Sequence, residues 1–346
     1  DKRFAAGYLH LTGGLTMPKL SQIIGQDLIK KQIQESVEND RVAQAYILTG
    51  EKGAGKEFIA SAFAEFLVCE NRGADACGEC HSCKQAESRV HPDIKYVIHE
   101  KPNSIGVEEV RDQICNDLPI KPYQAARKIY IVSEADKLTT QAQNALLKSL
   151  EEAPTYAVIL LLVSNLQMML PTVRSRCITW ELKPVPGDVL KKYLMRELQV
   201  PDYRADIAIA FAQGNLGKAR DMASSDDFSA MQAAAQSVVK NARDDSIADM
   251  IALVRSLAEY KVDPGEFLDM ITVWYRDILM FKATGETDSL VYKDDISIIR
   301  KASRRSSYEG IEEVLQAISR ARERLRANVG FEITMELLFA VIQENG

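Results

Sequence analysis

A glycine-rich run between an apolar segment and a helical pattern strongly limits what this chain can fold into. The run GEKGAGKEF covers residues 50–58; it follows the apolar stretch AYILT and leads into the helical pattern EFIASAFAEFLV. Glycines let backbone N–H groups turn toward phosphate oxygens, the helix N-terminus adds its positive end, and Lys56 reaches the outer phosphates. The run therefore predicts a phosphate loop built from Gly50, Gly53, Gly55 and Lys56 in an α/β fold.

Two positions depart from a working nucleotide site. The residue after Lys56 would be Ser or Thr, whose hydroxyl binds Mg²⁺, but Glu57 stands there. Its carboxylate would repel a phosphate by about 1–4 kcal/mol at 4 Å, depending on the effective dielectric. After a later apolar strand, Ser133 replaces the aspartate that would support the metal, whereas Glu134, which can polarise water, remains. The sequence predicts weak or absent binding of ATP and Mg²⁺.

Five short apolar segments alternate with helical stretches between residues 40 and 182. Their apolar character is continuous, which is typical of parallel strands covered by helices on both faces. A helix is expected between the third and fourth segments, with a capping box at Thr140 and Gln143 and an end before Pro154. The expected strands are residues 45–49, 94–98, 128–133, 158–165 and 177–182.

Strand signals end after KPVPGD at residues 183–188, and the remainder reads as helix. One helical block covers residues 188–235 with a break at GNLG, residues 214–217, and a second covers residues 245–346. Apolar residues recur at helical spacing in the second block, and core packing is the expected role for them. These residues are Ile311, Leu315, Ile318, Leu325, Ile333, Leu337, Leu338 and Val341.

Composition excludes several classes of protein. The 346 residues are 46% apolar, enough for two or three domains with real cores. The longest apolar run, residues 157–163, is far shorter than the roughly 20 residues of a membrane-spanning helix, and no secretory signal is present, so we expect a cytoplasmic protein. A net charge of −6 gives no general field for nucleic acid. Residues 1–16 precede the coherent pattern that begins at Met17, and we interpret them as an extension or a tag.

Four cysteines lie within 15 residues, in the run CENRGADACGECHSC. Two-residue gaps let successive thiolates converge on one ion, and four soft ligands close a tetrahedral shell around Zn²⁺. A closed shell has no open position for substrate, so a structural zinc module is expected; free or redox-active thiols and an iron–sulfur cluster are the alternatives. The predicted ligands are Cys69, Cys77, Cys80 and Cys83.

The remaining cysteines and two histidines carry weaker signals. Cys115 and Cys177 stand alone and are expected to be packed thiols. His81, between two ligands, is expected to face solvent, and His91 to lie in a turn before a strand. The sequence contains no evident Ser/His/Asp or Cys/His nucleophile set.

Three segments in this order and spacing resemble a known family: GEKGAGKE, IYIVSEADKLTTQAQNALLKSLEEAP and LLVSNLQMMLPTVRSRC. They are similar to the clamp-loader branch of the AAA+ ATPases, and within it to the δ′-type subunits of bacterial DNA polymerase III. The resemblance implies a RecA-like AAA+ core with a five-stranded parallel sheet at residues 17–184, including the zinc module at 69–83. It further implies a three-helix lid at 185–240 and a helical collar at 241–346 that assembles into a five-subunit ring.

The resemblance also implies roles for single residues. In the SRC motif of the family, an arginine reaches across a subunit boundary to the ATP of a neighbour; the motif maps to Ser175, Arg176 and Cys177. A guanidinium suits that role because it is permanently charged and forked, although a solvated arginine before a strand is the simpler alternative. Asn165 fits the polar sensor of the core. Gly217 stands where the lid would carry a sensor arginine, with Lys218 beside it.

The expected function is that of a stator subunit that cannot readily run its own ATP cycle but completes that of a neighbour. The implied partners are γ/τ motor subunits and δ in a hetero-pentameric ring, the sliding clamp, and primer-template DNA through the complex, with no membrane. Polymerase chemistry would belong to the complex. The main alternative is an active γ/τ-type motor, and a further one is a zinc-dependent nucleic-acid-binding module, which the acidic charge disfavours.

Overall fold

The computed structural model describes residues 19–242, 245–256, 264–327 and 329–345. The chain forms two compact units. The first unit ends at Val189 and also contains Gly214–Gly217; the second contains Leu190–Gln213 and the residues from Lys218 onward. The predictions for residues 1–16 and for Met17 lie outside the described residues.

The first unit is built on a five-stranded, all-parallel sheet, which confirms the expected fold. The strand order is β2-β3-β4-β1-β5, so the strand that precedes the glycine-rich run lies inside the sheet. The strands are β1 Ala45–Thr49, β2 Ile94–Tyr96, β3 Lys128–Val132, β4 Ala157–Val163 and β5 Ile178–Glu181.

Several strands are shorter than the sequence predicts. β2 stops at Tyr96, because both backbone groups of Ile98 bond to the side chain of Gln113 instead of to a neighbouring strand. β4 ends at Val163, so Ser164 and Asn165 are loop residues beyond the carboxyl end of the sheet. A side chain can thus end a ladder that the apolar pattern alone would extend.

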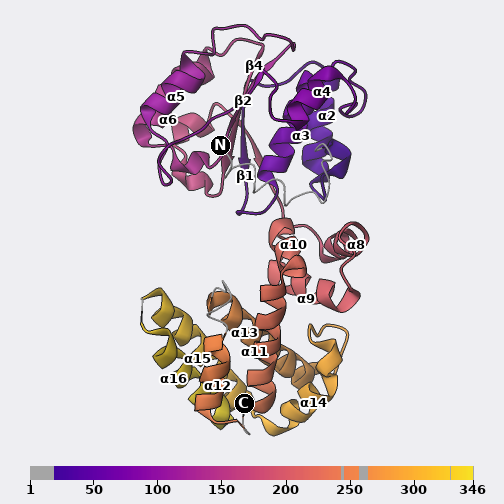
Figure 1. Ribbon diagram of the computed structural model, residues 1–346, viewed down its shortest axis with the longest axis vertical. Coiled ribbons are helices and arrows are strands. Elements are labelled where there is room, and N and C mark those ends of the chain that lie inside the picture. The colour runs from indigo at the N-terminus through magenta and orange to yellow at the C-terminus, as the bar shows by residue number, and fades with distance from the viewer. Residues whose placement is uncertain (1–18, 243–244, 257–263, 328, 346) are drawn as a thin grey trace. The chain divides into compact units, whose positions relative to one another are not determined.

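Helices cover both faces of the sheet, as the continuous apolar strands predict. In β1, Tyr46 and Leu48 pack with residues of α2 and α3, whereas Ile47 packs with residues of α6 on the opposite face. Figure 1 shows α5 and α6 on one side of the strands and α2, α3 and α4 on the other. The helices of this unit are α2 Asp27–Glu38, α3 Lys56–Val68, α4 His81–Glu87, α5 Val107–Val110, α6 Thr140–Glu151 and α7 Pro171–Arg174. Shorter turns are η1 Leu20–Gln22, the π-helical η2 Arg111–Cys115, η3 Ala135–Lys137 and η4 Leu166–Met168.

The cap of α6 differs from the prediction by one residue. Thr139, not Thr140, is the N-cap, and its hydroxyl accepts a hydrogen bond from the Ala142 amide at 3.2 Å. Gln143 does not close a capping box, because its side chain is buried and donates to the carbonyls of Leu138 and Met168. The expected end of the helix before Pro154 is confirmed, since α6 ends at Glu151.

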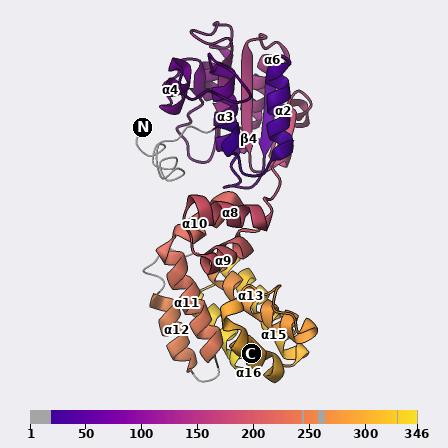
Figure 2. The same ribbon diagram turned by 90° about the vertical axis from the view of Figure 1, so that its right-hand side faces the viewer.

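The second unit is helical in its described residues, and its core includes the fully buried Trp274. Figure 2 shows α11 and α12 side by side in this unit. Its helices, counting α8 that starts at the boundary, are α8 Gly187–Glu197, α9 Asp202–Ala212, α10 Leu216–Ser224, α11 Asp226–Asn241, α12 Ile247–Ser256, α13 Pro264–Thr284, α14 Ile296–Arg305, α15 Tyr308–Arg326 and α16 Phe331–Asn345, with the 3₁₀ turn η6 Lys293–Asp295.

Most of the apolar stripe predicted in this unit is core, but two residues are not. Ile311, Ile318 and Leu338 are buried, whereas Ile333 is 58% exposed and Leu337 is 49% exposed. The buried face of α16 instead consists of Thr334, Met335, Leu338, Phe339 and Ile342. In its described residues the chain has no helix long and apolar enough to cross a membrane.

Candidate functional site

The phosphate-loop backbone follows β1 and enters α3 as the sequence predicts. Gly53 and Gly55 have φ angles of 87° and 96°, a region in which a side chain would strain the backbone. Gly55 is the N-cap of α3, and Lys56 is its first residue. The shape of the loop therefore depends on its glycines, and it places the lysine at the helix start.

Lys56 is engaged by its own loop. Its Nζ donates to the carbonyl oxygens of Gly50 and Glu51 at 2.5 and 2.8 Å and lies 3.3 Å from the Ser164 hydroxyl. Burial lowers the pKa of Lys56, while nearby carboxylates, first that of Asp136, oppose this shift. The cation that would reach for phosphate is thus satisfied by groups of the chain itself.

The turn at residues 214–217 binds the other half of the loop. The Asn215 side chain is buried and donates to the Lys52 carbonyl at 2.9 Å, and the Gly217 amide donates to the Gly53 carbonyl at 2.9 Å. A Cβ at Gly217 would lie 2.6 Å from that same oxygen, so the backbone leaves no room for a side chain. Lys56 binds the carbonyls of residues 50 and 51, and the turn binds those of residues 52 and 53. All four successive loop carbonyls therefore accept hydrogen bonds from groups of this unit.

Glu57 is paired with a residue that follows the cysteine cluster. Its Oε1 lies 3.2 Å from Arg89 Nη2, and the Arg89 guanidinium lies 4.7 Å from the ring centre of Tyr96. The carboxylate that stands in place of the metal-binding hydroxyl therefore holds an arginine, and through it the loop after α4.

The polar residues that follow β3 and β4 also form hydrogen bonds with their sequence neighbours. Glu134 has a left-handed backbone with φ 53°, and its Oε2 accepts a bond from Lys137 at 2.7 Å. The Asn165 side chain accepts a bond from the Gln167 amide at 2.9 Å. Ser133 precedes this turn at the end of β3. These residues gather beyond the carboxyl ends of the strands, as parallel topology requires.

Sequence reasoning missed three residues of this site: Asp136, Ser164 and Asn215. Asp136 accepts a bond from the Ser164 amide at 3.2 Å and is the carboxylate that most raises the pKa of Lys56. Ser164 and Asn215 are neighbours of residues that the sequence singled out, but only the fold shows that they contact the phosphate loop.

Arg176 lies at the other end of the strands, where their amino ends are. It precedes β5, and Ile178 is paired with Tyr46 in the parallel register, so Arg176 lies level with residue 44, before β1 begins. Gly50 is six residues farther along, which at about 3.3 Å per residue is roughly 20 Å. The arginine and the phosphate loop of the same chain are therefore too far apart to act on one nucleotide.

The guanidinium of Arg176 is bound to Glu151, the last residue of α6. Arg176 Nε donates to Glu151 Oε1 at 2.7 Å, Nη2 contacts the same oxygen, and Nη1 donates to the Thr172 carbonyl at 2.8 Å. About a third of the arginine side chain, 35%, remains exposed. Ser175 is exposed and donates to the Thr172 carbonyl, and burial raises the pKa of the Cys177 thiol to about 12.

The four cysteines of the predicted cluster come together. Their sulfur atoms all lie within 4.8 Å of one another. Backbone amides point at the sulfurs, from Cys77 to Cys69 at 3.3 Å, from Cys80 to Cys77 at 3.4 Å and from Cys83 to Cys80 at 3.4 Å. Amides of Glu79 and Cys80 lower the pKa of Cys77 to about 6, whereas burial raises the pKa of Cys69 and Cys83. The donor set, its closeness and its amide bonds fit a tetrahedral thiolate site.

The minor predictions are met in part. His81 is exposed as expected. His91 lies in the turn before β2, but it is buried, and its Nδ1 accepts a bond from the Asp93 amide at 3.1 Å. Cys115 and Cys177 are half-buried and pack against the core on one face of the sheet, as expected.

Two family models match the chain, one described as DNA polymerase III, delta subunit, over residues 25–186, and one as DNA polymerase III, delta subunit, C terminal, over residues 230–342. The chain is 28% identical to the DNA polymerase III subunit delta′ of Bacillus subtilis, over 92% of this chain and 96% of that protein. It is 37% identical to the delta′ subunit of Pseudomonas aeruginosa, over 47% of this chain and 50% of that protein.

A tau subunit is also among the relatives. The chain is 23% identical to the DNA polymerase III subunit tau of Bacillus subtilis, over 89% of this chain but only 58% of that protein. The two family models together cover more than half of the chain. The sequence resemblance is thereby confirmed, and the chain belongs to the clamp-loader subunits of DNA polymerase III, in the delta-subunit family that these models describe.

Proposed function

We propose that this chain is a δ′-type stator subunit of a bacterial clamp loader, which runs no ATP cycle of its own and lends Arg176 to the ATP site of a neighbour. One observation carries the proposal: Arg176 lies at the amino ends of the strands, roughly 20 Å from the chain's own phosphate loop. Its guanidinium stays partly exposed there. A cation in that position can serve a nucleotide only if another subunit brings it.

The state of the phosphate loop supports the loss of an autonomous ATP cycle. Two metal contacts are replaced, at Glu57 and Ser133. Lys56 is bound to loop carbonyls, and the turn with Asn215 and Gly217 pins the rest of the loop. Nucleotide would have to displace these bonds without the magnesium contacts that offset the charge of a triphosphate.

An active γ/τ-type motor is the alternative, and one observation favours it. The backbone of the phosphate loop is intact, with Gly53 and Gly55 in the conformation that phosphate binding uses. A tau subunit among the relatives points the same way. Against it stands the pairing of Glu57 with Arg89, which gives the replaced hydroxyl position a structural use.

We assign the parts of the chain by their place in such a subunit. Residues 17–184 form the AAA+ core, residues 185–240 the lid and residues 241–346 the collar that joins other clamp-loader subunits in a hetero-pentameric ring. The exposed Ile333 and Leu337 on α16 support a surface that partners cover. Through the ring, the subunit would help to place the sliding clamp on primer-template DNA.

Residues 69–83 form a structural zinc module in this proposal. Four sulfur ligands within 4.8 Å of one another support Zn²⁺, and a closed shell of four ligands leaves no catalytic position. The module would fix the region that precedes Arg89 and β2.

The proposal is tested by phosphate release from Mg-ATP, first with the purified chain alone. We expect no turnover above background at high protein concentration, and the Lys56→Ala variant should behave identically. Sustained turnover that Lys56→Ala abolishes would make the chain a motor. Salt-dependent binding of labelled primed DNA by the isolated chain would instead support a nucleic-acid-binding module.

A further inference from the structure

We propose that Glu151 is the positioning residue of Arg176. Its carboxylate holds the guanidinium in the orientation in which it contacts the nucleotide of a neighbouring subunit. This inference rests on the proposed trans-acting role of Arg176. It adds how this chain orients the arginine side chain before the arginine contacts a neighbour's nucleotide.

The bonds hold the guanidinium on two sides. Nε and Nη2 of Arg176 face Glu151 Oε1, and Nη1 faces the Thr172 carbonyl. A guanidinium has five N–H donors in a rigid planar fork, so two anchors at different edges fix both its place and its plane. Part of the fork remains exposed, because 35% of the side chain is accessible to solvent.

Both anchors belong to a rigid framework. Gln143 is buried in α6 and joins this helix to the segment before α7: its Nε2 donates to the Met168 carbonyl at 3.0 Å, and its Oε1 accepts from the Leu170 amide at 2.8 Å. Glu151 ends α6, and Thr172 lies in α7. The carboxylate and the carbonyl that hold the arginine are thus fixed relative to each other.

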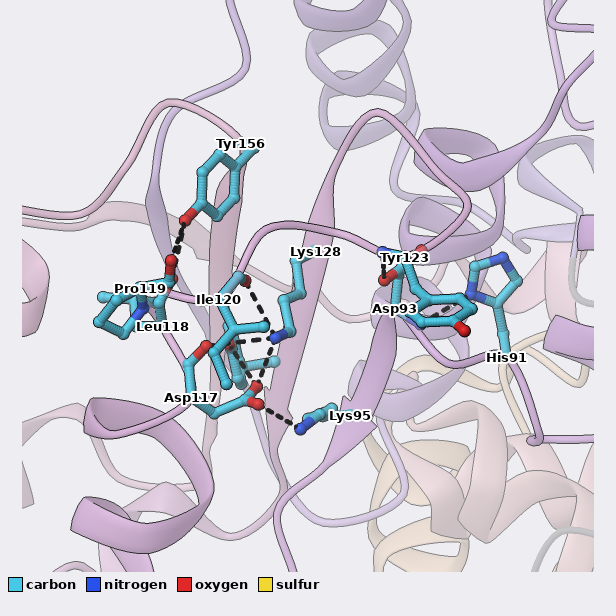
Figure 3. Close-up of polar contacts among 11 residues, drawn as sticks. His91, Asp93, Lys95, Asp117, Leu118, Pro119, Ile120, Tyr123, Lys128 and Tyr156 are labelled. Carbon is cyan, nitrogen blue, oxygen red and sulfur yellow. Dashed lines mark hydrogen bonds and ion pairs between the residues drawn. The ribbon is translucent and has the colours of Figure 1, made fainter.

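A second network of polar contacts holds the amino ends of β3 and β4. Figure 3 shows Lys128, at the start of β3, bonded to Asp117, with the Tyr156 hydroxyl turned to the carbonyls of Leu118 and Pro119. Lys128 is buried, so this network stiffens the amino ends of β3 and β4. Arg176 therefore lies at strand ends whose backbone is already rigid in the free subunit.

Arg176 borders an open pocket of about 570 Å³, which is also lined by Arg127 and Asp40. Arg127 is committed elsewhere: its Nη2 donates to Asp40 at 2.7 Å and its Nη1 to the Thr155 carbonyl at 3.0 Å, and only 12% of its side chain is exposed. Of the two arginines, Arg176 is the one that can present its charge to an incoming phosphate.

Positioning matters because an arginine side chain loses much rotamer freedom when it binds. If Glu151 orders Arg176 in advance, that loss does not have to be overcome when the neighbour's nucleotide reacts. A triphosphate carries more charge than one carboxylate and can take up the exposed donors while the Nε edge stays on Glu151.

The test uses the complete ring, assembled from this chain and the clamp-loader partners of the same organism, with sliding clamp and primed DNA. Phosphate release is measured over a range of Mg-ATP concentrations. Arg176→Ala should lower kcat at least about tenfold, because a trans-acting arginine supplies a large rate factor. Glu151→Ala should lower kcat roughly fivefold with KM changed less than about twofold, as expected when a transition-state contact is misplaced.

Two further variants separate positioning from structure. Glu151→Gln keeps an oxygen that accepts from Nε and should recover kcat to within about twofold of the original. Glu152→Ala is the matched control, because Glu152 is the next residue and, among the described residues, its carboxylate pairs with Lys148 alone, at 4.0 Å. Gel filtration should show the same amount of ring for every variant, and adding Glu151→Ala to Arg176→Ala should cause no further loss.

The outcomes divide cleanly. If Arg176→Ala slows the ring and Glu151→Ala does not, the positioning role is wrong and the proposed function stands. If neither variant changes turnover, the trans-acting arginine itself is wrong. Faster turnover in Glu151→Ala would mean that the carboxylate restrains the arginine, and a Glu151→Gln variant as slow as Glu151→Ala would exclude positioning by the acceptor oxygen.

Discussion

The two ends of the strands in the first unit carry opposite kinds of site. At the carboxyl ends, Lys56 and the loop carbonyls are bound to groups of the chain itself. At the amino ends, Arg176 is held by the Glu151 carboxylate, a backbone carbonyl and, at 3.4 Å, the Ser175 hydroxyl, beside an open pocket. Parallel strands keep the two ends apart, so one end can lose its chemistry without disturbing the other.

Each end also has its own support. Glu57 binds Arg89, which follows the cysteine cluster, and so joins the phosphate-loop end to that cluster. The amino ends are braced by the ion pair between the buried Lys128 and Asp117. Substitutions that weaken one support at a time show whether the effect stays at its own end of the strands.

The largest effect is expected for Cys80→Ser, which removes one thiolate of the cluster. Because metal binding and folding are coupled, we expect a loss of about 4 kcal/mol in the stability of the first unit. Stability is read by urea unfolding through Trp180 fluorescence in a Trp274→Phe background, since the chain has only two tryptophans. Zinc per chain is measured by mass spectrometry.

Cys115→Ser is the control for this prediction, because it makes the same change at a cysteine that lies outside the cluster. It should keep its zinc and most of its stability. A Cys80→Ser chain that still holds one zinc ion per molecule would contradict the ligand assignment.

The second prediction concerns the amino ends. Asp117 accepts bonds from Lys128 at 2.8 Å, Lys95 at 2.7 Å and the Tyr130 hydroxyl at 2.8 Å. Asp117→Asn leaves the buried Lys128 without its anion, and we expect a loss of about 3 kcal/mol in the same fluorescence assay. Asp112→Asn, an exposed change on the preceding turn, should alter stability by less than about 0.5 kcal/mol.

The pH dependence of this pair has a defined sign. Burial alone would raise the pKa of Asp117, but the bonds from Lys128, Lys95 and Tyr130 outweigh it and lower the pKa. The stabilisation is therefore complete above the unfolded pKa of about 3.9 and is lost as the pH falls through the lower folded value. The gap between the original chain and Asp117→Asn should close in that acidic range; a gap that stayed constant there would contradict the assigned ion pair.

The sequence predicts which segments form the site at the carboxyl ends of the strands, but it does not predict the contacts between those segments. Consecutive residues define the glycine run, the cysteine cluster and the five apolar strands, so local pattern is enough to locate them. The contact of Asn215 with Lys52 joins residues 163 positions apart, and no local pattern contains it. The same holds for Arg89 and Glu57, because an ion pair between distant segments depends on how the segments pack.

The errors have physical causes as well. The cap of α6 shifts to Thr139 because Gln143 is needed inside the fold, where it binds three backbone groups. On α16, Ile333 and Leu337 fit the helical period but lie on the face that the core does not cover. Periodicity predicts that a face is apolar, and packing decides whether this chain or a partner covers it.

A smaller effect is expected at the turn that pins the phosphate loop. A Cβ at Gly217 would meet the Gly53 carbonyl oxygen at 2.6 Å, so Gly217→Ala must push the loop and the turn apart. We expect a loss of about 2 kcal/mol and faster amide exchange in the loop. Gly73→Ala is the control, because an added Cβ there meets no atom within 4 Å in the described part of the chain beyond its two sequence neighbours. Unchanged exchange in Gly217→Ala would show that the turn does not hold the loop.

The smallest effect is expected for Glu57→Gln, which removes the charge at the position where a working phosphate loop has Ser or Thr. The pair with Arg89 is partly exposed, 41% for the glutamate side chain and 28% for the arginine, so its loss should lower stability by about 0.5 kcal/mol. The change also separates two explanations of the weak nucleotide binding that we propose. If the pinned carbonyls exclude nucleotide, a fluorescent ATP analogue should bind Glu57→Gln within about threefold of the original chain, because Arg89 already offsets the carboxylate. An affinity gain of tenfold or more, roughly 1.4 kcal/mol, would instead make the charge of Glu57 the main barrier and leave the carboxyl end only one substitution from binding nucleotide.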